Sequence, residues 1–266
     1  MNSFSSNVNK TLQSNTFLGL IVGENVITLQ RVNSTNDYLK SKLSNSTPYQ
    51  EGTVIMAVEQ YAGKGQAGNT WVSEAGQNLT LSILLNPTFL LPKEQFRLNI
   101  AISLAIIECI KPILGESVRI KWPNDIYVNN KKIGGILIEN IIRGSKWKHA
   151  IIGIALNVNQ TSFGIQKTKA CSLKKLLNKD FDLHKLLKLL CAAVSKQYHV
   201  LKKGGHLLQR ELYKQCLFRF NTPSSFLIDG VQVIGTITDV DDQGKLIIDF
   251  DGHLTKFCIK EISFVI

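Results

Sequence analysis

The sequence lacks the patterns that mark a disulfide-stabilised, zinc-binding or membrane-spanning protein. Its five cysteines are widely scattered and form no C-x-x-C pair, which favours reduced core thiols over a disulfide framework or a zinc site. The histidines show no H-E-x-x-H spacing, so a protein-ligated transition metal is not expected. No apolar run approaches the ~18 residues that a membrane-spanning helix needs, and a membrane location is not expected.

The beginning of the chain lacks the features of a secretory signal. Residues 1–16 are rich in Ser and Asn, with one lysine and no apolar core. We therefore expect a disordered tail there and a cytoplasmic location for the protein.

Acidic residues are scarce relative to basic ones, and the net charge is +11. Such an excess calls for an anionic partner or for an explanation in terms of solubility. The sequence shows no zinc-finger, homeodomain or RNA-recognition signature, so no specific DNA binding is expected. A nucleotide or an acidic protein substrate would be attracted by the same charge.

The pattern of apolar residues predicts an α+β fold with two domains. Strands are expected at residues 53–59, 79–85, 118–122, 126–128, 133–142 and 149–159. Helices are expected at 92–114, 183–202 and 207–218, with an N-terminal cap at residue 34 or 35 of another. From Ser224 onward short strands alternate with Asp- and Gly-containing turns, as in a small antiparallel barrel. The predicted domains are 17–221 and 222–266.

One hairpin concentrates residues that are useful for chemistry. Pro123 prevents a central strand from continuing, and an Asn-Asn pair favours a turn before the next apolar run. Gly134 and Gly135 remove side chains where a ligand could approach the backbone. Three charged residues near this bend have the types that hold a nucleotide, its magnesium and a developing oxyanion: Lys121, Asp125 and Lys132. A solvated charged hairpin is the alternative interpretation.

A glycine loop, G-x-G-x-x-G, lies between two of the predicted strands, with glycines at positions 63, 65 and 68. A dinucleotide-binding loop would be followed by a helix and by an acidic residue about 20 positions on. No helix is predicted there, and Thr88 occupies the neighbourhood of the acid. A kinase loop is excluded because no H-R-D or D-F-G follows. The remaining interpretations are a cationic loop that closes over an anion, through Lys64, or a merely structural loop.

Two further segments carry polar groups at strand and helix ends. Hydroxyls and amides cluster at Ser34, Thr35 and Asn36, where they could cap a helix or surround a small polar ligand. Asn157 follows apolar neighbours where core is expected, which predicts a hydrogen bond to a ligand or to backbone.

Taken together, these motifs resemble biotin protein ligases, in the right order and over roughly residues 18 to 266. The Lys-Trp-Pro-Asn-Asp motif at 121–125 is the specific one, and the glycine loop alone is not. The resemblance implies a mixed-sheet catalytic domain related to class II aminoacyl-tRNA synthetases, followed by an SH3-like barrel. It also implies ATP and Mg²⁺ as cofactors, biotin as substrate and a biotin carboxyl carrier protein as partner. A homodimer is left open.

The resemblance also implies roles for individual residues. The biotin-binding group comprises Ser34, Thr35, Asn36, Gln60, Lys64, Gly65, Gln66, Lys132, Gly134 and Gly135. The nucleotide-binding group comprises Gly63, Gly68, Trp71, Lys121, Asn124 and Asn157. Lys64, Gly65 and Gln66 would cover the biotin carboxylate and adenylate phosphate, and Lys132 would bridge the two. The catalytic group comprises Lys132, Lys121, Asp125 and Lys64. Asp125 would either organise magnesium or act as a base toward the acceptor amine.

Two departures from the family pattern are visible. The family's loop is typically rich in arginine, whereas this loop carries Lys64, Gln66, Ala67 and Asn69, and lysine lacks the bidentate fork of arginine. The polar tail before residue 17 is also too short for the winged-helix DNA-binding domain of some relatives, which disfavours a repressor role. Two alternatives to a biotin ligase stay open: a lipoate or octanoate ligase of similar fold, and a non-catalytic nucleic-acid-binding module.

Overall fold

The computed structural model describes residues 22–43, 49–164 and 169–266. The predicted disordered tail, residues 1–16, lies outside the described residues. The elements that are described make an α+β fold with a mixed sheet, as the sequence predicts.

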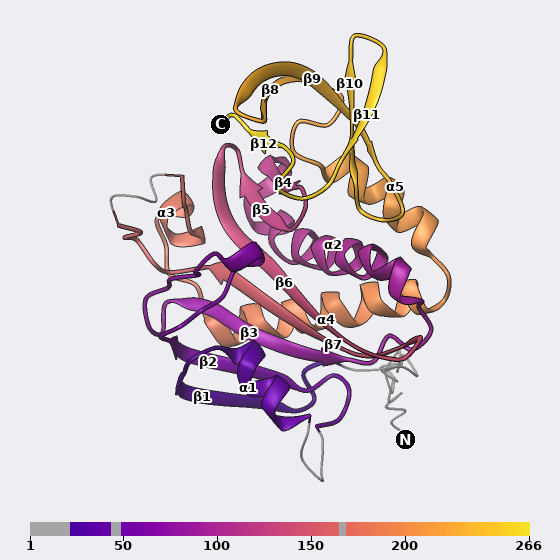
Figure 1. Cartoon of the computed structure of the whole chain (residues 1–266). Coiled ribbons are helices and arrows are strands. Elements are labelled where there is room, and N and C mark those ends of the chain that lie inside the picture. Colours follow the sequence, from indigo (N-terminus) through magenta and orange to yellow (C-terminus); the bar gives the residue numbers. More distant parts are fainter. Residues whose placement is uncertain (1–21, 44–48, 165–168) are drawn as a thin grey trace, which may run out of the picture.

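Seven strands form the larger sheet, in the order β1-β2-β3-β7-β6-β5-β4 (Figure 1). Their bounds are β1 Val26–Val32, β2 Val54–Gln60, β3 Asn78–Leu85, β4 Val118–Lys121, β5 Asp125–Val128, β6 Lys131–Arg143 and β7 Lys146–Asn157. β1 and β2 are parallel, and the other neighbouring pairs are antiparallel. The consecutive strands β4 to β7 form the meander that the turn residues predict. β3 pairs with the far side of β7, so β7 lies between β6 and β3.

The two long helices pack together over this sheet, and their apolar patterns explain why. In α2 (Gln95–Leu114) twelve residues are buried, and α2 packs along α4 (Leu183–Lys202). Pro92 begins a short 3₁₀ turn before α2, and Gly115 ends the helix with a positive φ, as expected for these residues. The shorter α1 (Thr35–Lys42) packs on β3 and β7, where Leu39 joins a smaller core of alternate strand residues.

The apolar helix could be mistaken for a membrane span. By length and composition alone the segment Pro92–Ser117 is sufficient to cross a membrane, although no long uninterrupted apolar run stands out in the sequence. In the structure 61% of it is buried inside the fold. It is therefore packed as a core helix.

The C-terminal strands form a second sheet, antiparallel and in the order β11-β10-β9-β8-β12. Their bounds are β8 Pro223–Ile228, β9 Val231–Val240, β10 Leu246–Phe250, β11 His253–Phe257 and β12 Ser263–Phe264. Helix α5 (His206–Cys216) precedes them, and Arg210 of α5 pairs with Asp239 and Asp242. The domain boundaries, the SH3-like barrel and the relation to aminoacyl-tRNA synthetases stay predictions.

The sequence analysis was partly wrong about the cysteines. All five are free thiols, as expected. Three are buried, but Cys216 is only half-buried and Cys258 is exposed, so core packing does not explain the last. The short helix α3 (Leu173–Leu177), which Ser172 caps, contains Lys174 and Lys175, which were expected on or near a helical segment, although its bounds were not predicted. No cluster of three or more metal-ligating side chains occurs in the described ranges.

Candidate functional site

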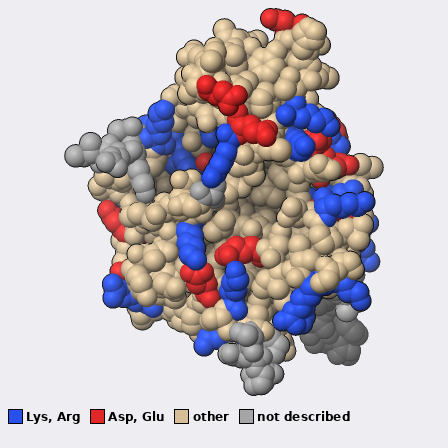
Figure 2. Space-filling model, viewed as in Figure 1, with Lys and Arg blue, Asp and Glu red and all other residues tan. Residues whose placement is uncertain are grey.

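A cavity of about 390 Å³ opens on the sheet, between the glycine loop, the β4–β5 hairpin and the C-terminal strands. Figure 2 shows this face hollowed, with lysines and carboxylates around the hollow. Most of the residues that the sequence analysis selects line it. They are Ser34, Thr35, Asn36, Gln60, Lys64, Gly65, Gln66, Trp71, Lys121, Asn124, Asp125, Lys132 and Gly135.

At one end of the cavity, the first turn of α1 builds a buried polar network. The Ser34 hydroxyl caps the helix by accepting from the Asp37 N–H at 3.4 Å, so the capping prediction is confirmed. Gln60 Oε1 accepts from the backbone N–H and the hydroxyl of Thr35, at 2.7 and 3.0 Å. Asn36 donates to Glu139 at 2.8 Å and to the Leu137 carbonyl at 3.3 Å.

Glycine at position 153 makes room for this network. Ser82 Oγ lies 2.7 Å from Thr35 Oγ1 and 2.5 Å from Asn36 Oδ1. A Cβ atom on Gly153 would lie 2.7 Å from Asn36 Oδ1, closer than real Cβ contacts allow. The polar groups thus hold one another in place. They present hydrogen-bond donors and acceptors to the cavity in fixed orientations.

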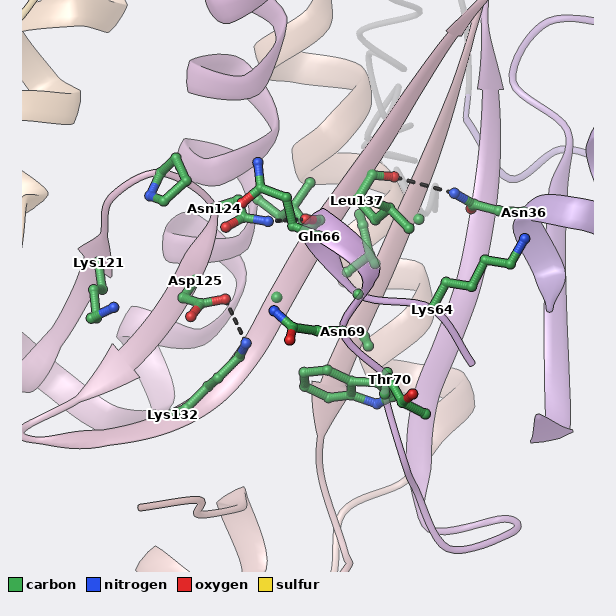
Figure 3. Close-up of a pocket in the computed structure, with 18 of the residues that line it drawn as sticks. Asn36, Lys64, Gln66, Asn69, Thr70, Lys121, Asn124, Asp125, Lys132 and Leu137 are labelled. Carbon is green, nitrogen blue, oxygen red and sulfur yellow. Dashed lines mark hydrogen bonds and ion pairs between the residues drawn. The ribbon is translucent and has the colours of Figure 1, made fainter. Parts of the chain in front are cut away.

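The β5–β6 hairpin supplies a charged pair at the other end. Lys132 Nζ lies 2.6 Å from Asp125 Oδ1, and their side chains are 33% and 20% exposed. The same ammonium lies 5.2 Å from the centre of the Trp71 ring. A Cβ atom on Gly135 would lie in ordinary van der Waals contact, 3.4 to 3.5 Å, with all three side chains, so Gly135 lies at the point where they converge. The close-up in Figure 3 shows the Asp125–Lys132 pair facing the cavity.

Lys121 occupies an aromatic environment beside this pair. Its ammonium lies 4.7 Å from the centre of the Phe264 ring and 5.5 Å from that of Tyr127. Burial lowers the pKa of Lys121, and the nearby Asp125 carboxylate opposes this shift. The charge of Lys121 is therefore poorly solvated, which makes the lysine a strong attractor for an anion that enters the cavity.

The glycine loop folds back on itself. The Gly65 N–H donates to the Asn69 carbonyl at 2.7 Å, and the Trp71 N–H donates to the Gly63 carbonyl at 2.9 Å. Lys64 Nζ lies 2.7 Å from Asp37 Oδ1 of α1, and this hydrogen bond raises the pKa of Lys64. Figure 3 shows Lys64 extending to the Asn36 side, away from Lys132.

Four of the selected residues do not line the cavity. Asn157 is buried and donates to the Cys171 carbonyl at 2.9 Å, which is the backbone alternative that the sequence analysis left open. Gly134 faces the neighbouring strand, where a Cβ atom would lie 2.9 Å from the Ala155 carbonyl oxygen. Gly63 and Gly68 shape the turn of the loop and are not cavity residues.

Sequence reasoning missed one wall of the cavity. Five C-terminal residues line it: Ile259, Lys260, Ile262, Ser263 and Phe264. Trp122 ties the β4–β5 hairpin to the C-terminal sheet, because its indole N–H donates to the carbonyl of Gly244, in the turn between β9 and β10, at 2.9 Å. No motif marks these residues. Asp37 was missed as a partner for Lys64, although its place directly after Asn36 could have suggested a role.

Comparison with known proteins places this cavity in a family. Residues 28–157 match the model of the biotin/lipoate A/B protein ligase family, a range that contains every site residue selected from the sequence. Over these residues the chain is similar to this family. A solved relative, the biotin protein ligase from Aquifex aeolicus in complex with biotin and ATP, superposes on the ligase fold described here with a TM-score of 0.75. It is 25% identical, and the match covers 90% of this chain and 98% of that one.

Curated relatives of the chain are ligases too. The bifunctional ligase/repressor BirA of Bacillus spizizenii is 27% identical over 91% of this chain and 75% of its own length. The biotin–[acetyl-CoA-carboxylase] ligase of Mycobacterium tuberculosis is 25% identical over 83% of this chain and 81% of its own length. The β4–β5 hairpin and the polar turn of α1 therefore lie in a fold shared with biotin ligases.

Proposed function

We propose that the protein is an ATP-dependent biotin protein ligase, which forms biotinyl-5′-AMP and transfers the biotinyl group to a lysine of a biotin carboxyl carrier domain. One observation carries the proposal. In a chain that matches the model of the ligase family, one cavity is lined both by the neutral polar network of α1 and by two cations, Lys121 of β4 and Lys132 of β6. The neutral end suits the ureido ring of biotin, and the cationic end suits a carboxylate and a triphosphate.

In the first step, a carboxylate oxygen of biotin attacks the α-phosphorus of ATP. The bond from that phosphorus to the bridging oxygen breaks, and pyrophosphate leaves. Both reactants are anions, so their approach needs fixed positive charge. Lys132 would bridge the biotin carboxylate and the phosphate, Lys121 would contact phosphate, and Gly65 and Gln66 would cover the junction.

Asp125 fits a magnesium ion held jointly with substrate. Among the described residues that line the cavity it is the one carboxylate, and Mg²⁺ is commonly held by one or two carboxylates together with substrate phosphates. When bound there, the ion would neutralise phosphate charge. Asn124 is fixed beside it, since its side chain donates to the Ile136 carbonyl at 2.6 Å.

In the second step, a neutral carrier-lysine amine attacks the acyl carbon of the adenylate, AMP leaves and the amine gives up a proton. Asp125 is the residue placed to orient that amine or to accept the proton. Lys132 lies 2.6 Å from it and would hold the carboxylate in place.

The test is biotin-dependent exchange of radiolabelled pyrophosphate into ATP, followed by transfer of biotin to a carrier domain. A carrier from acetyl-CoA carboxylase is the first to use, because relatives are named as biotin–[acetyl-CoA-carboxylase] ligases. Exchange and transfer are both expected. No exchange with biotin at millimolar concentration would refute the proposal.

A lipoate ligase is the second candidate, because the matching family model covers biotin and lipoate ligases together. The two differ in what their ligand offers to Ser34, Thr35 and Gln60. Biotin presents a ureido group with donors and an acceptor, whereas lipoate presents a dithiolane without them. Exchange driven by lipoate and not by biotin would select this candidate. A third outcome, salt-sensitive nucleic-acid binding without ATP turnover, would favour a binding module.

A cytoplasmic location and the lack of specific DNA binding stay predictions. So does a homodimer, whose presence sedimentation would measure.

A further inference from the structure

We propose that Asp37 is a positioning residue, which holds the glycine loop over the biotin end of the cavity by binding Lys64. The ammonium of Lys64 then acts on the loop and not on the reacting phosphate. The kinetic part of this inference rests on the proposed function, and the structural part does not.

The side chain of Lys64 points toward α1. Lys64 Nζ lies 2.7 Å from Asp37 Oδ1, and Figure 3 shows it extending away from the Asp125–Lys132 pair. Asp37 belongs to the first turn of α1, directly after the three polar residues that line the cavity. The contact therefore joins the loop to the element that supplies the polar end of the site.

The glycine loop is closed by hydrogen bonds of its own. Its internal bonds, Gly65 to Asn69 and Trp71 to Gly63, make it a small closed unit. These bonds lie within the loop, so its place over the cavity depends on contacts with other elements, such as the Ala62 N–H donating to the Asn33 carbonyl at 3.0 Å. Lys64, at the base of the loop, ties the loop to α1. This ion pair thereby orients the side-chain amides of Gln66 and Asn69, which line the cavity.

Lys64 lies in an acidic surrounding. Glu139 of β6 also attracts Lys64, and Glu139 is itself held by Asn36 at 2.8 Å and by Lys40 at 3.5 Å. Lys64 thus faces two carboxylates, Asp37 and Glu139, and one other cation, Lys40. Lys132 is also paired, with Asp125 at 2.6 Å, but that pair faces the cavity, whereas an anionic ligand would have to draw Lys64 away from two carboxylates.

The first experiment needs no substrate. Hydrogen–deuterium exchange of the Gly65, Asn69 and Trp71 amides is measured on the full chain for wild type, Asp37→Asn and Lys64→Gln. Both variants should exchange about two- to fivefold faster at these amides, the range expected from losing an exposed ion pair. The control is Glu116→Gln, which removes the exposed pair with Lys111 at the far end of α2 and should leave the loop unchanged.

The second experiment separates positioning from direct contact. In biotin-dependent exchange, Asp37→Asn and Lys64→Gln should each raise KM for biotin by the same two- to fivefold with kcat unchanged. Their double variant should be no worse than either alone, and the charge swap Asp37→Lys with Lys64→Asp should restore most of the loss. The inference would be overturned if Lys64→Gln showed a large fall in kcat while Asp37→Asn kept wild-type kinetics. It would also be overturned if hydrogen–deuterium exchange of the loop amides were unchanged in both variants.

Discussion

Replacing Lys132 by alanine tests the charged end of the cavity most directly. The substitution removes the ammonium 2.6 Å from Asp125 Oδ1 and leaves that carboxylate facing the incoming anions alone. Loss of one electrostatic stabiliser of a transition state costs about 3 kcal/mol, or roughly 100-fold in rate. The uncompensated Asp125 charge adds repulsion, so biotinyl-adenylate should form at least ~100-fold more slowly. Because the pair is partly solvated, stability should fall by no more than about 1 kcal/mol.

The assay is biotin-dependent pyrophosphate exchange at saturating ATP, with the thermal unfolding midpoint as a check on folding. Lys131→Ala is the matched control, since Lys131 is the preceding residue of β6 and its side chain is exposed. It should exchange like wild type. Exchange within about threefold of wild type in Lys132→Ala would refute the reasoning and remove Lys132 from the chemistry.

Three further predictions concern other parts of the site. Burial lowers the pKa of Lys121, so ATP affinity should fall as pH rises through that lowered value, earlier than for a solvated lysine. Lys121→Arg, which stays charged, should shift the fall to higher pH in a profile of KM for ATP. Gly153→Ala should raise KM for biotin about tenfold or more by displacing Asn36. A dissociation constant for biotin equal to that of wild type, measured by titration calorimetry, would contradict this. Trp122→Phe removes the bond to Gly244, and should lower stability by about 1–2 kcal/mol in urea unfolding.

The local elements were predictable because each is encoded in adjacent residues. The 92–114 helix has a starting proline, an apolar stripe and a terminal glycine, and the structure confirms it as a 3₁₀ turn followed by α2. The meander of β4 to β7 follows from strands separated by short polar turns. The polar turn at Ser34 follows from capping chemistry.

The arrangement of distant segments was not predictable in this way. The antiparallel pairing of β3 with β7 joins residues about 65 to 79 positions apart, from Leu85 with Ala150 to Asn78 with Asn157, and no local signal encodes it. The same holds for Phe264 over Lys121. Asn157 was selected because an amide stood where core was expected, yet its partner is the Cys171 carbonyl. The residue type therefore indicated that Asn157 makes a hydrogen bond, and only the fold showed which group is its partner.

The C-terminal wall of the cavity has a consequence for how the protein is made. Ile259 to Phe264 follow every other lining residue in the chain, and a ribosome adds them after all the rest of the site. While they remain in the exit tunnel, Lys121 lacks the Phe264 ring that covers it. The end of the cavity that carries Lys121 is therefore the last to be completed during synthesis.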